Sequence, residues 1–356
     1  MINEIALRDK RDKQQEYTVH LFEYCNLTCS FCWQDHNKVQ GIDTILEKLV
    51  PIEKFLQTEK NKQVVFNIMG GEIFADQIYN ETLNTTYIEL AKGIVALGEK
   101  YNIQVGINWV TNLVTDKITL IEDLLCETKK LGIKSSLVTS YDPAGRFNRN
   151  TFPIFKKNLY HFKNDVEGIG ILLTKPNIRY WLKMKESFID QIYNDGFYIY
   201  ADYYMPDVSA KMQAPTDTDL YRIFTHFVNK FPKIDPIRSW IENDFNYITC
   251  RTSKLILQDG TMCLCGNLVQ EPKDKVMYVS FIQKADNSAI ENRFLEKYNC
   301  LSCEYFKRCG LGCFMQHDYK FRDELDECVY KLTHRYIDDV RVQQKRKAVE
   351  FADLSI

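Results

Sequence analysis

The chain has 356 residues, of which 45% are hydrophobic and 26% are charged, a balance typical of soluble globular proteins with one large domain or two unequal ones. Its net charge of −2 is not that of a duplex nucleic-acid binder, which usually has a strongly basic surface. The N-terminal segment lacks the apolar core of a signal peptide, and no stretch approaches the ~18 apolar residues of a membrane span. We therefore expect a cytoplasmic protein with no membrane partner and no duplex nucleic-acid partner.

The cysteine content is unusual for that compartment. Thiols stay reduced in the cytosol, so twelve cysteines indicate metal or redox chemistry instead of disulfides. Three lie between residues 25 and 32, Cys126 stands alone, and eight fall between residues 250 and 328. We expect Cys126 to belong to the core, because it lies in a helical segment of apolar periodicity.

Six apolar runs predict six strands with helical segments between them. The predicted strands are 17–24, 64–69, 104–110, 134–139, 168–174 and 197–204. Strands that alternate with helices form a parallel sheet of right-handed βα units. A closed eightfold barrel usually needs about 250 residues, whereas roughly 200 residues hold six units here. The sequence therefore predicts an α/β fold with an open, partial (β/α)6 barrel of the TIM type.

The helical segments carry recognisable ends. Residues 87–97 repeat apolar side chains at three- and four-residue spacing, which predicts one buried face. A second helix is predicted from an N-cap at Asp116 to a stop before Gly132. A third is predicted to follow Pro176 and to end near Gly196.

After residue 215 the pattern changes to a capped helix and then to the cysteine-rich region. Segment 254–265 predicts a hairpin in which Asp259 and Gly260 supply the positive-φ turn. The chain is predicted to comprise a partial barrel, a bridging helical segment, a cysteine-rich domain and a helical tail, at residues 1–215, 216–245, 246–335 and 336–356.

Polar, small or cysteine residues follow every predicted strand. These segments are "CNLTCSFC", "GGE", "TN", "SYD", "TKPN" and "MPD". In parallel α/β sheets the ligand lies beyond the C-terminal ends of the strands. The sequence therefore predicts one shared site.

Cys25, Cys29 and Cys32 follow the first predicted strand directly. A structural zinc site normally needs four ligands, and a [4Fe-4S] cube normally takes four thiolates, so three thiols leave one iron open to another ligand. The spacing C-x3-C-x2-C after the first strand resembles the signature of the radical SAM enzymes. In that family the open iron binds the amino and carboxylate groups of S-adenosylmethionine. An electron from the cluster then releases a 5′-deoxyadenosyl radical, which abstracts hydrogen from the substrate.

The resemblance implies that S-adenosylmethionine binds around this loop. Phe31 stands before the last cysteine, where the family usually has an aromatic residue near the adenine. Gly70, Gly71 and Glu72 match the family's GGE motif and would meet the methionine amino group. The glycines would let backbone approach the ligand closely, and the carboxylate would accept hydrogen bonds from the ammonium group. A tight turn and a solvated charge are the alternative explanations for these residues.

The third and fourth strands add further candidates for the same pocket. Ser140 and Asp142 belong to a segment that resembles the family's serine-containing motif, which contacts the ribose or the carboxylate. Arg146 is then a candidate partner for the methionine carboxylate. Asn112, after the third strand, is a candidate for the pocket or an ordinary turn residue.

The C-terminal cysteines form a second pattern, C-x9-G-x4-C, then C-x2-C-x5-C-x3-C, then one more cysteine. It resembles the SPASM extension of radical SAM enzymes, which holds two auxiliary [4Fe-4S] clusters. A zinc ribbon would explain the C-x2-C pair, but it predicts neither the hairpin nor the upstream loop. By resemblance, the first cluster would be bound by Cys250, Cys265 and Cys313, and the second by Cys300, Cys303, Cys309 and Cys328.

Cys263 has no place in the family pattern, and the first auxiliary cluster lacks a fourth ligand. Because Cys263 and Cys265 are two positions apart on a predicted strand, they point to the same face. Three roles are open to Cys263: the fourth ligand of the first auxiliary cluster, a hydrogen-atom donor to the substrate, or a buried structural thiol.

The end of the sixth predicted strand supplies candidate catalytic residues, namely Asp202, Tyr203 and Tyr204. Asn108 and Trp109 on the third strand come next. Ordinary barrel packing is the alternative explanation for all five.

The resemblance implies three [4Fe-4S] clusters, S-adenosylmethionine and a flavodoxin- or ferredoxin-type reductant. SPASM enzymes mostly modify peptides or proteins by side-chain oxidation or by cross-linking, and a minority act on small molecules. Our first hypothesis is oxidative modification of a peptide or protein, and the second is a small-molecule dehydrogenase. The third is a non-catalytic iron–sulfur electron carrier, although a carrier needs no open iron beside a methionine site. Only about sixteen residues precede the first predicted strand, too few for a peptide-recognition domain. This counts against the peptide hypothesis without excluding it, because such a domain can be a separate protein.

Overall fold

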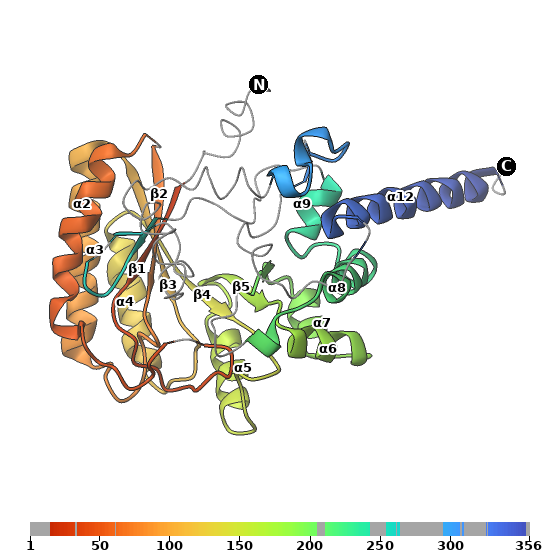
Figure 1. The fold of residues 1–356 in the computed structure, drawn as a ribbon. Coiled ribbons are helices and arrows are strands. Elements are labelled where there is room, and N and C mark those ends of the chain that lie inside the picture. Colours follow the sequence, from red (N-terminus) through yellow and green to blue (C-terminus); the bar gives the residue numbers. More distant parts are fainter. Residues whose placement is uncertain are drawn as a thin grey trace.

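The computed structural model describes residues 15–32, 34–60, 62–204, 211–242, 254–260, 262–263, 295–306, 308–309, 325 and 327–353. Their central feature is one curled sheet with the strand order β6-β5-β4-β3-β2-β1-β7-β8. The first six strands are β1 Gln15–His20, β2 Gln63–Met69, β3 Gln104–Val110, β4 Lys134–Ser140, β5 Val166–Leu172 and β6 Ile199–Asp202. Their neighbours pair in parallel, so the sheet forms the predicted partial barrel, with helices α2, α3 and α4 along one side (Figure 1).

The predicted hairpin is present, and it also extends the barrel. β7 (Lys254–Ile256) pairs with β8 (Met262–Cys263) in antiparallel fashion, and Gly260 in the turn has a φ of 79°. β7 also pairs in parallel with β1, which gives the barrel a seventh parallel strand that the sequence did not predict. The sheet therefore contains strands from both sides of the predicted boundary at residue 246, and the domain boundaries stay predictions.

The helices join successive strands of the barrel or follow β6. They are η1 Ile42–Lys48, α2 Leu49–Thr58, α3 Glu81–Tyr101, α4 Ile118–Lys130, α5 Thr151–His161, α6 Lys175–Lys183, α7 Phe188–Asn194, η2 Lys211–Gln213, α8 Asp217–Lys230, α9 Ile237–Glu242, η4 Cys300–Ser302 and α12 Val329–Asp353. None of those described is long and apolar enough to cross a membrane.

Two predictions about helix ends were wrong. The N-cap residue of α4 is Lys117 and not Asp116, whose backbone N–H donates to Asp76 Oδ1 at 2.9 Å. The segment after Pro176 forms two helices, α6 and α7, because Ser187 begins a capping box with Asp190.

The prediction of a buried Cys126 was also wrong. α4 buries Ile121, Leu124 and Leu125 against the sheet, and Cys126 lies outside that stripe and is exposed. In a helix of 3.6 residues per turn, adjacent side chains point about 100° apart, so the burial of Leu125 does not imply the burial of Cys126.

Strand alternation divides the sheet into an apolar face and a polar face. Trp109 faces the helices, where its ring lies 5.6 Å from that of Tyr87 in α3. On the opposite, concave face Asn108 Nδ2 donates to Asn67 Oδ1 at 3.0 Å, and Ser136 Oγ lies 2.9 Å from Asn108 Oδ1. The concave face therefore carries polar side chains across three adjacent strands.

Candidate functional site

The loop after β1 is joined tightly to the loop after β2. Gly71 N donates to Phe22 O at 2.9 Å, and Glu72 N donates to Tyr24 O at 2.7 Å. A Cβ on Gly71 would lie only 2.1 Å from Glu23 O and 2.2 Å from Tyr24 O. Position 71 therefore requires glycine, because any side chain would separate the two loops.

Glu72 then connects the loop after β2 to the loop after β3. Its buried carboxylate accepts hydrogen bonds from Phe74 N at 2.9 Å, Thr111 Oγ1 at 2.7 Å and Asn112 N at 2.5 Å. Burial raises the pKa of Glu72 to about 7 despite these donors. Its contact with a methionine amino group stays a prediction, and the structure adds a structural role as the anchor of the Thr111–Asn112 turn.

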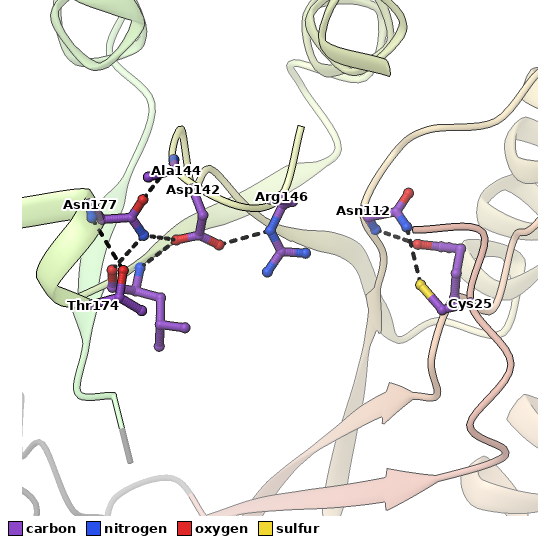
Figure 2. A network of polar contacts seen from close by, with 9 residues as sticks. Cys25, Asn112, Asp142, Ala144, Arg146, Thr174 and Asn177 are labelled. Carbon is purple, nitrogen blue, oxygen red and sulfur yellow. Dashed lines mark hydrogen bonds and ion pairs between the residues drawn. The ribbon is translucent and has the colours of Figure 1, made fainter. Parts of the chain in front are cut away.

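Asn112 connects that turn back to the cysteine loop (Figure 2). Asn112 Nδ2 donates to Asn26 Oδ1 at 2.8 Å and lies 3.8 Å from Cys25 Sγ. Asn26 Nδ2 in turn donates to Val114 O at 2.5 Å. The first cysteine is thus held between two asparagine side chains.

The loop after β4 meets the other end of the cysteine loop. Ser30 N donates to Gly145 O at 3.1 Å, and the guanidinium carbon of Arg146 lies 5.4 Å from the centre of the Phe31 ring. Phe31 and Arg146, which the sequence placed in one pocket, are therefore brought together. Ser140 ends β4 and is half-buried on the same side of the strand as Ser136.

Asp142 lies between Asn177 and Arg146 and positions Arg146 (Figure 2). Its carboxylate, which is fully buried, accepts from Arg146 Nε at 2.8 Å, Leu172 N at 2.8 Å and Asn177 Nδ2 at 3.1 Å. Burial raises the pKa of Asp142, and the charge of Arg146 opposes that rise. A direct contact of Asp142 with a cofactor stays a prediction, and in the structure its carboxylate positions Arg146.

The three thiols of the loop are close to one another and shielded from water. Burial raises the pKa of Cys25 to about 12 and that of Cys29 to about 11. Cys29 and Cys32 contribute to the first shift, and Cys32 contributes to the second. Protonated, shielded thiols of this kind are poor nucleophiles, which argues against a catalytic thiolate. None of the described cysteines forms a disulfide.

The chemistry of these three thiols is compatible with an iron–sulfur cube. Within the described ranges, no three Cys, His, Asp or Glu side chains are close enough to hold one ion. A cube binds each thiolate to a different iron, so its ligands lie farther apart than the four thiolates of a zinc site. Three half-buried or buried thiols in one loop, without a disulfide, are consistent with such a ligand set.

Among the candidate catalytic residues, Asp202 lies on the concave face. It is open to solvent there, yet strand atoms surround it closely enough that desolvation raises its pKa to about 7. The negative charges of Asp142 and Glu16 raise that pKa further. Asp202 is therefore able to hold or release a proton near neutral pH.

The other candidates mostly serve packing. The Tyr203 ring lies 6.2 Å from Phe224 in α8 and 6.0 Å from Tyr330 in α12, and Tyr204 is buried. Trp109 is buried on the helix side, while Asn108 remains on the concave face.

The C-terminal cysteines are only partly described. Cys250, Cys265 and Cys313 lie outside the described residues, and Cys263 is described only as a strand residue. Burial raises the pKa of the Cys300 thiol to about 12, and the thiols of Cys328 and Cys303 are near enough to contribute. Cys309 N donates to Tyr305 O at 2.8 Å, which closes the turn between the C-x2-C pair and Cys309. The auxiliary clusters stay a prediction.

His20 is a residue of this site that the sequence did not reveal. Its Nε2 lies 2.7 Å from Gln34 Nε2, and its Nδ1 lies 3.1 Å from Gln258 Nε2 in the β7–β8 turn. Burial lowers the pKa of His20 to about 4, so the ring is neutral and bridges the cysteine loop to the hairpin. Its position at the end of β1 could have indicated a site residue, because strand ends carry the site. Its contact with Gln258 could not be predicted, because that contact depends on the unpredicted pairing of β1 with β7.

No protein-family model and no curated protein matches the chain. Among solved structures, SuiB of Streptococcus suis aligns with 90% of this chain and 79% of its own length, at 15% identity and a TM-score of 0.47. Methylornithine synthase (PylB) aligns with 65% of this chain and 68% of its own length, at 14% identity and a TM-score of 0.35. These similarities are too distant to assign the chain to a family.

Gly71→Ala should destabilise the fold by more than about 3 kcal/mol, because the added methyl group clashes with backbone that cannot move independently. Gly106→Ala is the matched control, since its Cβ would meet Lys134 O at an ordinary 3.4 Å. The control should change stability by about 1 kcal/mol or less. Urea denaturation of both variants measures the difference, and equal stabilities would contradict the close approach at Gly71.

Asp202→Asn should alter how stability depends on pH. Because the folded-state pKa of about 7 lies above the ordinary value, the stability contributed by protonated Asp202 is present below about pH 4 and lost as pH rises through 7. The melting temperature of Asp202→Asn minus that of the wild type should therefore increase between pH 5.5 and 8. A constant difference over that range, measured by thermal scans, would show that the pKa of Asp202 is not raised.

Proposed function

We propose that the chain is a radical SAM enzyme in which Cys25, Cys29 and Cys32 hold a [4Fe-4S] cluster. The observation that carries the proposal is the C-x3-C-x2-C loop at the C-terminal end of β1, joined to the GGE segment after β2 by two backbone hydrogen bonds. When bound, the cluster supplies the electron that cleaves S-adenosylmethionine, and the resulting 5′-deoxyadenosyl radical takes hydrogen from the substrate.

The residues around the loop would bind and orient S-adenosylmethionine. The Nε–H of Arg146 donates to Asp142, and the two Nη groups of Arg146 form no hydrogen bond with the described residues. They are therefore available for the methionine carboxylate, as a planar guanidinium prefers. Phe31 lies beside Arg146 and would contact the adenine. Gly70 and Gly71 would meet the methionine amino group through their backbone.

We further propose two auxiliary [4Fe-4S] clusters in the cysteine-rich region and oxidative modification of a peptide or protein substrate. The support is the spacing of the seven cysteines and the proximity of Cys300, Cys303 and Cys328. A flavodoxin- or ferredoxin-type protein would supply the electron, and a separate protein would present the peptide. Asp202 would take the proton that a substrate loses on oxidation, because it faces the concave side with a pKa near neutrality.

Replacing Cys25, Cys29 and Cys32 together with alanine should remove about four of about twelve irons per chain, because eleven of the twelve cysteines lie in cluster-like groups. The variant should also form no 5′-deoxyadenosine from S-adenosylmethionine and dithionite. Cys126→Ala is the matched control, since this exposed cysteine should affect neither signal. Iron analysis and chromatography measure both. Continued 5′-deoxyadenosine formation by the triple variant would overturn the proposal.

Cys263→Ala should distinguish the three roles open to that residue. If Cys263 is a ligand, the variant should alter the paramagnetic resonance spectrum of one auxiliary cluster, because one iron loses its thiolate. If it is a hydrogen donor, the spectrum and 5′-deoxyadenosine formation should persist while product formation stops. If it is structural, all signals should persist with a loss of about 1 kcal/mol. We expect the first result, since eight cysteines divide into two sets of four.

A further inference from the structure

Asn112 has one hydrogen-bond donor that points to a cysteine sulfur. Its backbone N–H donates to Glu72 Oε2 at 2.5 Å, and its side-chain Oδ1 accepts from Val114 N at 2.8 Å. One N–H of its amide donates to Asn26 Oδ1 at 2.8 Å. The remaining amide N–H faces Cys25 Sγ, which lies 3.8 Å from Nδ2 (Figure 2).

The neighbouring groups fix the orientation of this amide. Val114 N can only donate, so the atom of Asn112 that faces it must be oxygen. Asn26 is fixed in the same way, because its amide nitrogen donates to Val114 O at 2.5 Å and its oxygen therefore faces Asn112. With both amides assigned by backbone partners, the atom of Asn112 that faces the sulfur is nitrogen, while Asn26 Oδ1 lies 4.0 Å from the same sulfur as an acceptor for the free thiol.

The turn that holds Asn112 is built at a conformational cost. Leu113 adopts a φ of 56° although it is not glycine, and its side chain is fully buried. Such a conformation persists only where the surroundings enforce it, and it concentrates at functional sites. Asn158 Nδ2 helps to enforce it by donating to Leu113 O at 2.9 Å and Thr115 O at 2.8 Å.

We propose that Asn112 donates an N–H···S hydrogen bond to the Cys25 thiolate of the bound cluster and raises the reduction potential of that cluster. The inference rests on the proposed function, because it requires iron at Cys25. A donor to a cluster sulfur stabilises the reduced state, which carries one more negative charge. Leu27 N, 3.4 Å from Cys25 Sγ, is a second donor to the same sulfur. Asn112 is thus a positioning and tuning residue that need not touch S-adenosylmethionine.

The direct test uses the wild-type protein with its clusters and without S-adenosylmethionine. Asparagine labelled with ¹⁵N only at the side-chain amide is incorporated, and the reduced cluster at Cys25 is examined by electron–nuclear double resonance. The expected result is a ¹⁵N coupling that disappears in Asn112→Leu. A wild-type cluster without ¹⁵N coupling overturns the inference and leaves the proposed function intact, whereas a loop that takes up no iron overturns both.

A redox titration of variants provides the second readout. Asn112→Leu should lower the potential by up to about 59 mV, which corresponds to a tenfold change in the equilibrium constant of a one-electron couple. Asn112→Asp keeps an oxygen for Val114 N but loses the donor and adds a negative charge, so it should lower the potential by more than Asn112→Leu does. Asn158→Leu is the matched control, because it removes two hydrogen bonds from the same turn but none from the sulfur.

The control separates tuning from general disturbance of the turn. Asn158→Leu should keep the wild-type potential and the ¹⁵N coupling while losing thermal stability. If Asn158→Leu lowers the potential as much as Asn112→Leu does, or if neither Asn112 variant changes it, the N–H···S bond is not responsible and the inference fails.

Discussion

The close approach of the Gly71 backbone to Glu23 and Tyr24 is the constraint on which the site depends. With a Cβ predicted only 2.1 Å from Glu23 O, the cysteine loop and the end of β2 touch through backbone alone. This contact places Glu72 where its carboxylate reaches the end of β3. The cysteine loop is therefore positioned by the sheet itself, as expected for a site at the C-terminal ends of parallel strands.

Two buried carboxylates repeat one arrangement on either side of the cysteine loop. Glu72 accepts three hydrogen bonds and fixes Asn112, and Asp142 accepts three and fixes Arg146. In both cases burial raises the carboxyl pKa, and protein donors offset part of the desolvation. Asn112 faces Cys25 at one end of the loop, while Arg146 contacts Phe31 at the other. Rigid anchors behind the contacting residues preorganise the site before any ligand arrives.

Short sequence patterns predicted the strands and one shared site, because an apolar run and the polar residues that follow it both lie within a short segment. They could not predict the pairing of β7 with β1, because that contact joins residues more than 230 positions apart, such as Tyr17 and Lys254. The same limit hid the link from His20 to Gln258. The hydrogen bond from Arg146 to Asp142 was not predicted either, because a motif gives position along the chain and not the direction of a side chain.

The described parts of the cysteine-rich region contact both edges of the open barrel. β7 pairs with β1 at one edge, and Tyr330 in α12 contacts Tyr203 directly after β6 at the other. If the proposed auxiliary clusters form, ligands from the hairpin side and from the segment before α12 become joined by metal–thiolate bonds. Ligation free energy then adds to folding free energy. Cluster uptake would therefore stabilise the barrel at its two edges, which are the places where an open sheet lacks neighbouring strands.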